Sequence, residues 1–110
     1  MAQLADRACV PCRGGVPPME RPQAEQMLAE LGGDWQLREN GYLSLEKTYR
    51  FKDFSEALDF VNRVGALAQE QAHHPDIHLS WGRATVQIWT HKIKGLTESD
   101  FIFAAKCDRL

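Results

Sequence analysis

The sequence is poor in cysteine, has no excess of basic residues and contains no long apolar run. Its three cysteines are an odd number, which argues against a disulfide framework and for a reducing compartment. Lysine and arginine total 13 against 15 acidic residues, so the net charge is −2 and the basic excess typical of nucleic-acid-binding proteins is absent. No stretch approaches the roughly 18 apolar residues of a membrane span, and no signal-peptide core is recognisable. We therefore expect a cytoplasmic protein that binds neither nucleic acid nor membranes.

The length and composition favour one globular domain. A chain of 110 residues lies in the typical size range of a single domain. Hydrophobic residues make up 44% of it, a fraction close to the globular average and too high for a disordered chain. We divide the sequence into an irregular N-terminal arm, residues 1–18, and a folded domain, residues 19–110.

The arm contains a C-x-x-C pair, Cys9 and Cys12. Such a pair can be half of a zinc site or a redox dithiol, but a structural zinc needs four ligands and no second pair has a suitable spacing. A redox pair is expected to follow a strand and to open a helix. Here Pro11 separates the cysteines, and glycines and prolines follow them. An irregular segment without chemistry is therefore the favoured interpretation.

The remainder of the sequence alternates helical patterns with pairs of strand patterns. Apolar residues at helical spacing predict helices over 21–31, 53–74 and 97–110, and period-two alternation predicts strands over 34–39, 43–51, 77–81 and 84–91. Asn40-Gly41 is typical of a type I′ hairpin turn, and Gly82-Arg83 of a second tight turn. Lys47 alone interrupts the apolar face of its strand. The order helix, two strands, helix, two strands, helix indicates an α+β fold with helices covering a small antiparallel sheet.

Three of the four histidines, His73, His74 and His78, lie within six residues, and the fourth is His91. His73 and His74 are expected at the C-terminal end of the second helix, whose dipole favours the protonated imidazole. His91 is expected to end the fourth strand, on the face opposite the apolar residues. A helix end and a strand end can meet at one rim of a small sheet, and histidines gathered there suit proton transfer at neutral pH.

Structural interpretations compete with this hypothesis. A histidine pair at a helix terminus is often only a solvated or capping pair. A metal site is the less favoured interpretation, because no H-E-x-x-H spacing exists and the nearest carboxylate, Asp76, lies beyond Pro75. His78 faces away from the apolar side of its strand, so we expect it to be exposed. Asp100 follows Thr97 by three residues, which is the spacing of a helix-capping box.

A series of spaced motifs resembles the pterin-4a-carbinolamine dehydratase family. The residues that carry the resemblance are Ala72-His73-His74-Pro75, Trp81, Val86, Thr90-His91, Gly95-Leu96-Thr97 and Asp100. Several elements match in the same order, and upstream segments such as Phe51-Lys52-Asp53-Phe54 and the arm from Cys12 to Met19 also resemble bacterial members. The resemblance therefore covers nearly the whole chain. It implies a four-stranded antiparallel sheet with three helices on one face, associating into homodimers or homotetramers.

The resemblance implies an enzyme that dehydrates 4a-hydroxytetrahydropterin to quinonoid dihydropterin. This reaction recycles the pterin cofactor of aromatic amino acid hydroxylases, and functional coupling to such a hydroxylase is implied. Loss of the hydroxyl needs a proton delivered to oxygen and another removed from N5, which histidines can do without a metal or organic cofactor. Two alternatives stay open: a protein-binding module that acts as a dimerisation or regulatory partner, and a dehydratase-like protein of another pterin or molybdopterin pathway.

The family pattern also implies particular site residues. His73, His74 and His91 match its three active-site histidines; we expect His73 or His91 to be the acid, another histidine the base, and His74 to orient the pterin. Asp100 matches a position from which it could orient a histidine, and Trp81 is a candidate stacking surface, as is Trp89. Some members carry an acidic residue directly before the histidine pair, where this sequence has Ala72. Glu70 is then the nearest acid upstream that could replace it.

Overall fold

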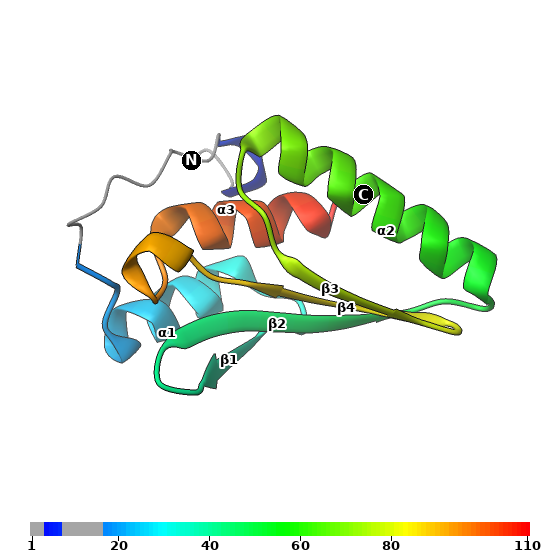
Figure 1. The fold of residues 1–110 in the computed structure, drawn as a ribbon. Coiled ribbons are helices and arrows are strands. Elements are labelled where there is room, and N and C mark those ends of the chain that lie inside the picture. The colour runs from blue at the N-terminus through cyan, green and yellow to red at the C-terminus, as the bar shows by residue number, and fades with distance from the viewer. Residues whose placement is uncertain (1–3, 8–16) are drawn as a thin grey trace.

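The computed structural model describes residues 4–7 and 17–110 and confirms the predicted α+β fold (Figure 1). Its elements in chain order are the 3-10 helix η1 (Leu4–Asp6), α1 (Arg21–Leu31), β1 (Gln36–Glu39), β2 (Leu43–Arg50), α2 (Phe54–Gln71), β3 (Asp76–Ser80), β4 (Arg83–Ile88), the 3-10 helix η2 (His91–Ile93) and α3 (Glu98–Cys107). Cys9 and Cys12 lie outside the described residues. Among those residues, none of the helices has the length and apolarity needed to span a lipid bilayer.

The four strands form one antiparallel sheet in the order β1-β2-β4-β3. Because β2 and β3 are both antiparallel to β4, they run parallel to each other, and α2 connects them across β4. The start of β3 therefore lies at the same end of the sheet as the start of β2 and the end of β4. Gln87 of β4, for example, pairs with Glu46 of β2 and Asp76 of β3. This end of the sheet carries the candidate site.

The core lies between one face of the sheet and the three helices. Alternate residues of β4, namely Ala84, Val86 and Ile88, are fully buried there, as is Leu45 of β2. The helices contribute Ala24 from α1, Phe60, Val64 and Ala68 from α2, and Phe101 and Phe103 from α3. Burial of these side chains is the main force that holds the helices on the sheet.

Both hairpin turns differ in detail from the sequence prediction. The first loop has three residues, Asn40 to Tyr42, because Glu39 pairs with Leu43; only Gly41 has a positive φ, so the predicted type I′ turn is wrong. The second turn is Trp81-Gly82, since Ser80 pairs with Arg83. Gly82 adopts a φ of 71°, which suits glycine and fixes the turn one residue earlier than predicted.

Helix α2 begins as predicted but ends earlier. Asp53 caps its N-terminus by accepting a hydrogen bond from the Glu56 N–H at 2.8 Å. The helix ends at Gln71, and Ala72 adopts a left-handed conformation with φ 53°. The backbone N–H of His73 still bonds the Ala68 carbonyl at 3.1 Å, as in a Schellman ending. The prediction that His73 and His74 lie on the helix is thus wrong: they follow its cap.

The first described residues pack against α3, and Leu4 is part of the core. Leu4 is 5% exposed. The Lys106 ammonium donates to the Ala5 carbonyl at 2.9 Å, and Arg7 pairs with Glu98 at 2.6 Å. Within the stretch predicted as an irregular arm, this short 3-10 helix is therefore a structured segment.

Candidate active site

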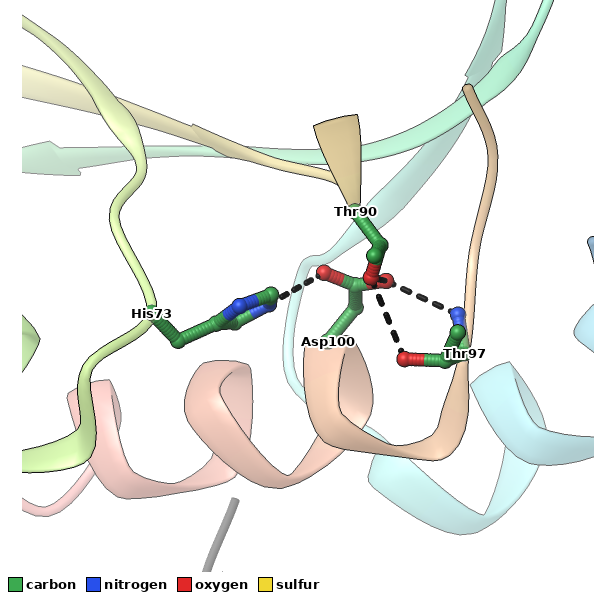
Figure 2. A network of polar contacts seen from close by, with 4 residues as sticks. All are labelled: His73, Thr90, Thr97 and Asp100. Atoms are coloured by element: carbon green, nitrogen blue, oxygen red, sulfur yellow. Dashed lines mark hydrogen bonds and ion pairs between the residues drawn. The ribbon is translucent and has the colours of Figure 1, made fainter. Parts of the chain in front are cut away.

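A buried carboxylate and a histidine meet at the end of the sheet where α2 leads into β3 and β4 leads towards α3. His73 lies in the segment between α2 and β3, and Asp100 lies in the first turn of α3 (Figure 2). The His73 Nε2 and Asp100 Oδ1 atoms are 2.6 Å apart. Asp100 is fully buried, and the His73 side chain is 14% exposed. The pair therefore has a protected carboxylate behind a histidine that retains access to solvent.

The other oxygen of Asp100 is held by two threonines. Its Oδ2 atom accepts from the Thr90 hydroxyl at 2.8 Å and from the backbone N–H of Thr97 at 2.8 Å (Figure 2). The contact with Thr97 belongs to the predicted capping box of α3. The two threonine hydroxyls are also 3.1 Å apart. Because both carboxylate oxygens have partners, this buried group is satisfied and fixed in orientation.

The contact with Asp100 determines how His73 presents its ring. A carboxylate accepts hydrogen bonds, so Nε2 carries the proton that is donated to Oδ1. Nδ1 is then the unprotonated ring nitrogen, which can accept a proton. The edge of the His73 ring also contacts Phe103, with centroids 6.0 Å apart. The partner of His73 is thus a carboxylate from α3, rather than the end of helix α2 or an acid preceding the histidine pair.

Its neighbour His74 is exposed and has a different partner. The His74 Nε2 and Gln69 Oε1 atoms are 2.6 Å apart, and Gln69 lies in the last turn of α2. Glu70, the upstream acid, instead accepts a hydrogen bond from the Gln71 side chain at 3.3 Å. Among the described residues, no hydrogen bond or ion pair joins Glu70 to His73. Glu70 therefore does not take the place of the acidic residue that some members carry where this chain has Ala72.

The structure places His91 in η2 and not at the end of a strand. Strand β4 ends at Ile88, and Thr90 pairs with Gly95 to close the loop that contains His91. Thr90 points to the buried side, whereas the rings of Trp89 and His91 lie against each other with centroids 4.3 Å apart. The predicted alternation is therefore correct although the strand is shorter. No hydrogen bond or ring contact joins His91 to His73 or His74 within the described part of the chain.

Trp81 is far from these groups. It lies in the β3–β4 turn, with 71% of its surface exposed, whereas the histidine pair precedes the opposite end of β3. Five strand residues, or about 15 Å, separate the two ends. The structure therefore does not bring Trp81 together with His73 and Asp100 within one copy of the chain, and its role in binding or orienting the substrate stays a prediction. His78 is exposed, as predicted.

Two residues that hold site groups do not stand out in the sequence. Thr90 is one residue of the Thr90-His91 motif, and Gln69 lies within the predicted helix over 53–74. Short motifs do not reveal that a threonine at a strand end will meet a carboxylate in the next helix. Among residues 4–7 and 17–110, no three histidine, cysteine, aspartate or glutamate side chains are arranged to hold a metal ion.

The fold and this site together define an α+β protein in which a buried carboxylate supports a histidine. A model of the family described as "Pterin 4 alpha carbinolamine dehydratase" matches residues 17–110. A full-length relative from Rubrobacter xylanophilus, provisionally named a pterin-4-alpha-carbinolamine dehydratase, is 56% identical over 110 residues, which is all of both chains. The chain belongs to this dehydratase family, and a dehydratase is a hydro-lyase.

Solved structures agree with the fold. A crystal structure described as a transcriptional coactivator/pterin dehydratase from Brucella melitensis is 29% identical, with a TM-score of 0.75 over 84% of this chain and 96% of that chain. A pterin dehydratase-like protein, described as a RuBisCO assembly factor in the alpha-carboxysome, is 20% identical with a TM-score of 0.61, over 72% of this chain and 90% of that chain. At that identity, the second likeness concerns the fold alone.

Proposed function

We propose that this chain dehydrates a 4a-hydroxytetrahydropterin to the quinonoid dihydropterin by histidine acid–base catalysis. The observation that supports this most strongly is the contact of 2.6 Å between His73 and the buried Asp100, in a member of the dehydratase family. A carboxylate that holds an imidazole in one tautomer is a recurring device of proton-transfer sites. The reaction recycles the pterin that an aromatic amino acid hydroxylase has used.

The reaction needs two proton transfers and no oxidant. A proton passes to the oxygen on C4a, the C4a–O bond breaks and water leaves. The N5 electron pair forms the C4a–N5 double bond, and the N5 proton passes to a base. The donor and the acceptor return to their starting states by exchanging one proton through solvent. Substrate therefore becomes quinonoid dihydropterin plus water, and all atoms and electrons balance.

The three histidines divide these tasks. His73 and His91 exchange protons with the substrate, one at the C4a hydroxyl and the other at N5, and exposed His74 orients the pterin. Asp100 is a positioning residue that holds His73 with Nδ1 towards the substrate. The expected homodimer or homotetramer, and coupling to a hydroxylase, belong to this proposal as predictions from the family resemblance.

The direct test adds the purified protein to a phenylalanine hydroxylase reaction and follows decay of the 4a-carbinolamine. We expect the wild-type chain to accelerate this decay. Alanine at His73, His74 or His91 should slow the catalysed rate, with a loss of about 10²–10⁴-fold for a histidine that transfers a proton. His78→Ala is the matched control, because His78 is an exposed histidine outside the site. Near-normal rates in all three site variants would refute the proposal.

A further inference from the structure

The two residues that follow closely on β4, Trp89 and Thr90, point to opposite sides of the sheet. Thr90 points inward and donates to Asp100, which in turn holds His73. Trp89 points the other way and lies against His91. Two neighbouring residues thus reach two of the three site histidines: Trp89 contacts His91 directly, and Thr90 is linked to His73 through Asp100.

Three rings form a continuous row on the outer side, which we call the aromatic row: Tyr42, Trp89 and His91. The Tyr42 and Trp89 centroids are 5.1 Å apart at an interplanar angle of 33°, and those of Trp89 and His91 are 4.3 Å apart at 48°. These separations are typical of favourable aromatic contacts. Trp89 and Tyr42 are both half-buried, whereas His91 is exposed at the end of the row.

The backbone around His91 is held firmly, but its ring has few restraints. Two backbone hydrogen bonds close the loop: the Thr90 N–H donates to the Gly95 carbonyl at 2.8 Å, and the Gly95 N–H donates to the Thr90 carbonyl at 3.4 Å. Within the loop, the Lys94 N–H donates to the His91 carbonyl at 3.3 Å. Among the described residues, the His91 imidazole has no hydrogen-bond partner; its ring contact is with Trp89. The orientation of that imidazole therefore depends on the indole.

We propose that Trp89 is a positioning residue for His91, with Tyr42 supporting the indole from behind. The inference rests on the proposed function, in which His91 exchanges a proton with the pterin. Trp89 holds the imidazole at the angle that proton transfer requires, as Asp100 does for His73. Displacing a reacting group by about 1 Å can lower a rate by up to roughly 100-fold. A ring that is restrained by one tilted aromatic contact is therefore sensitive to loss of the indole.

The test compares Trp89→Leu and Trp89→Phe by NMR and by steady-state kinetics. In the wild-type protein, the ring current of Trp89 should displace the His91 Cε1–H and Cδ2–H resonances from those of exposed His78; His91→Ala identifies them. Trp89→Leu should return these resonances to values near those of His78 and lower kcat about tenfold, with KM changed less than about twofold. Trp89→Phe keeps an aromatic surface and should recover kcat to within about threefold of wild type. Thr85→Val, on the same outer side of β4, is the control for a general disturbance of the strand.

Unchanged His91 resonances in Trp89→Leu would overturn the inference, whatever the rate. A loss of rate that Trp89→Phe does not restore would also overturn it, because an aromatic surface would then be insufficient. If the wild-type chain has no dehydratase activity, the proposed function fails separately, and the His91 resonances alone decide whether Trp89 positions the ring.

Discussion

Asp100 and Asp108 lie at the two ends of α3, and each gathers hydrogen-bond donors from distant parts of the chain. Asp100 serves the candidate site. Asp108 accepts from the Lys47 ammonium at 2.8 Å, the Tyr49 hydroxyl at 2.6 Å and the Trp35 indole N–H at 3.0 Å. Lys47, the one interruption of an apolar strand face, thus has a structural explanation: it pairs with the C-terminal end of the last helix.

Within the cluster around Asp108, the Tyr49 hydroxyl resists ionisation. Burial, and secondarily the hydrogen bond to Asp108, raise the pKa of Tyr49 well above its usual value. The Tyr49 hydroxyl therefore keeps donating to the carboxylate at alkaline pH. The Lys47 ammonium also lies 4.8 Å from the Tyr49 ring centroid, a favourable cation–π arrangement.

Asp108→Ala should lower the free energy of unfolding by about 1–3 kcal/mol, because three partly buried donors would lose their acceptor. The measurement is equilibrium unfolding in urea. Asp59→Ala is the control. The Asp59 side chain is 71% exposed and, among the described residues, pairs with Arg63 one turn away, so a change within about 0.5 kcal/mol is expected. Equal effects of the two substitutions would contradict the role given to Asp108.

At the scale of elements, the three helices and four strands were predictable because their apolar periodicities are clear. Their ends were less predictable, since tertiary contacts determine them. The left-handed cap at Ala72 moves the histidine pair off α2, and no glycine marks that position in the sequence. Strand β4 stops at Ile88 because the chain turns there into the loop closed by Thr90 and Gly95.

The loop that carries His91 is held in place by an unusually close approach to the segment before α1. A Cβ atom added to Gly95 would lie 2.4 Å from the Pro18 Cβ, too close for any side chain, and the Met19 N–H bonds the Leu96 carbonyl at 2.9 Å. Glycine is therefore required at position 95 for space. Residues 17–19 thus pack across the loop that leads into α3 and hydrogen-bond to it.

Gly95→Ala should accordingly lower the free energy of unfolding by about 1–3 kcal/mol, as expected for overpacking, and should slow the dehydration by shifting His91. Urea unfolding and the carbinolamine assay measure the two effects. The clash is with the Pro18 Cβ, which Pro18→Gly removes. In the Pro18→Gly background, Gly95→Ala should therefore cost much less unfolding free energy and much less rate than it does in the wild type. Additive losses in the double variant would show that Pro18 is not the obstacle.

At the scale of the whole molecule, the site exists because distant segments converge at one end of the sheet. His73 and Asp100 are 27 positions apart in the sequence and come from different elements. Each residue could be singled out from its motif, but their contact could not, because it depends on how α3 packs beside α2. The same limit explains Trp81, which shares a motif with the histidines yet lies at the opposite end of the β3–β4 hairpin.

A double-mutant cycle on His73 and Asp100 tests the central claim, that this pair acts as one unit in pterin dehydration. Rates of 4a-carbinolamine decay are measured for the wild type, His73→Ala, Asp100→Asn and the double variant, with urea unfolding to verify that each is folded. If Asp100 acts through His73, the double variant should be no more than about threefold slower than the slower single variant. Losses that multiply in the double variant, or an Asp100→Asn rate equal to wild type, would contradict the account.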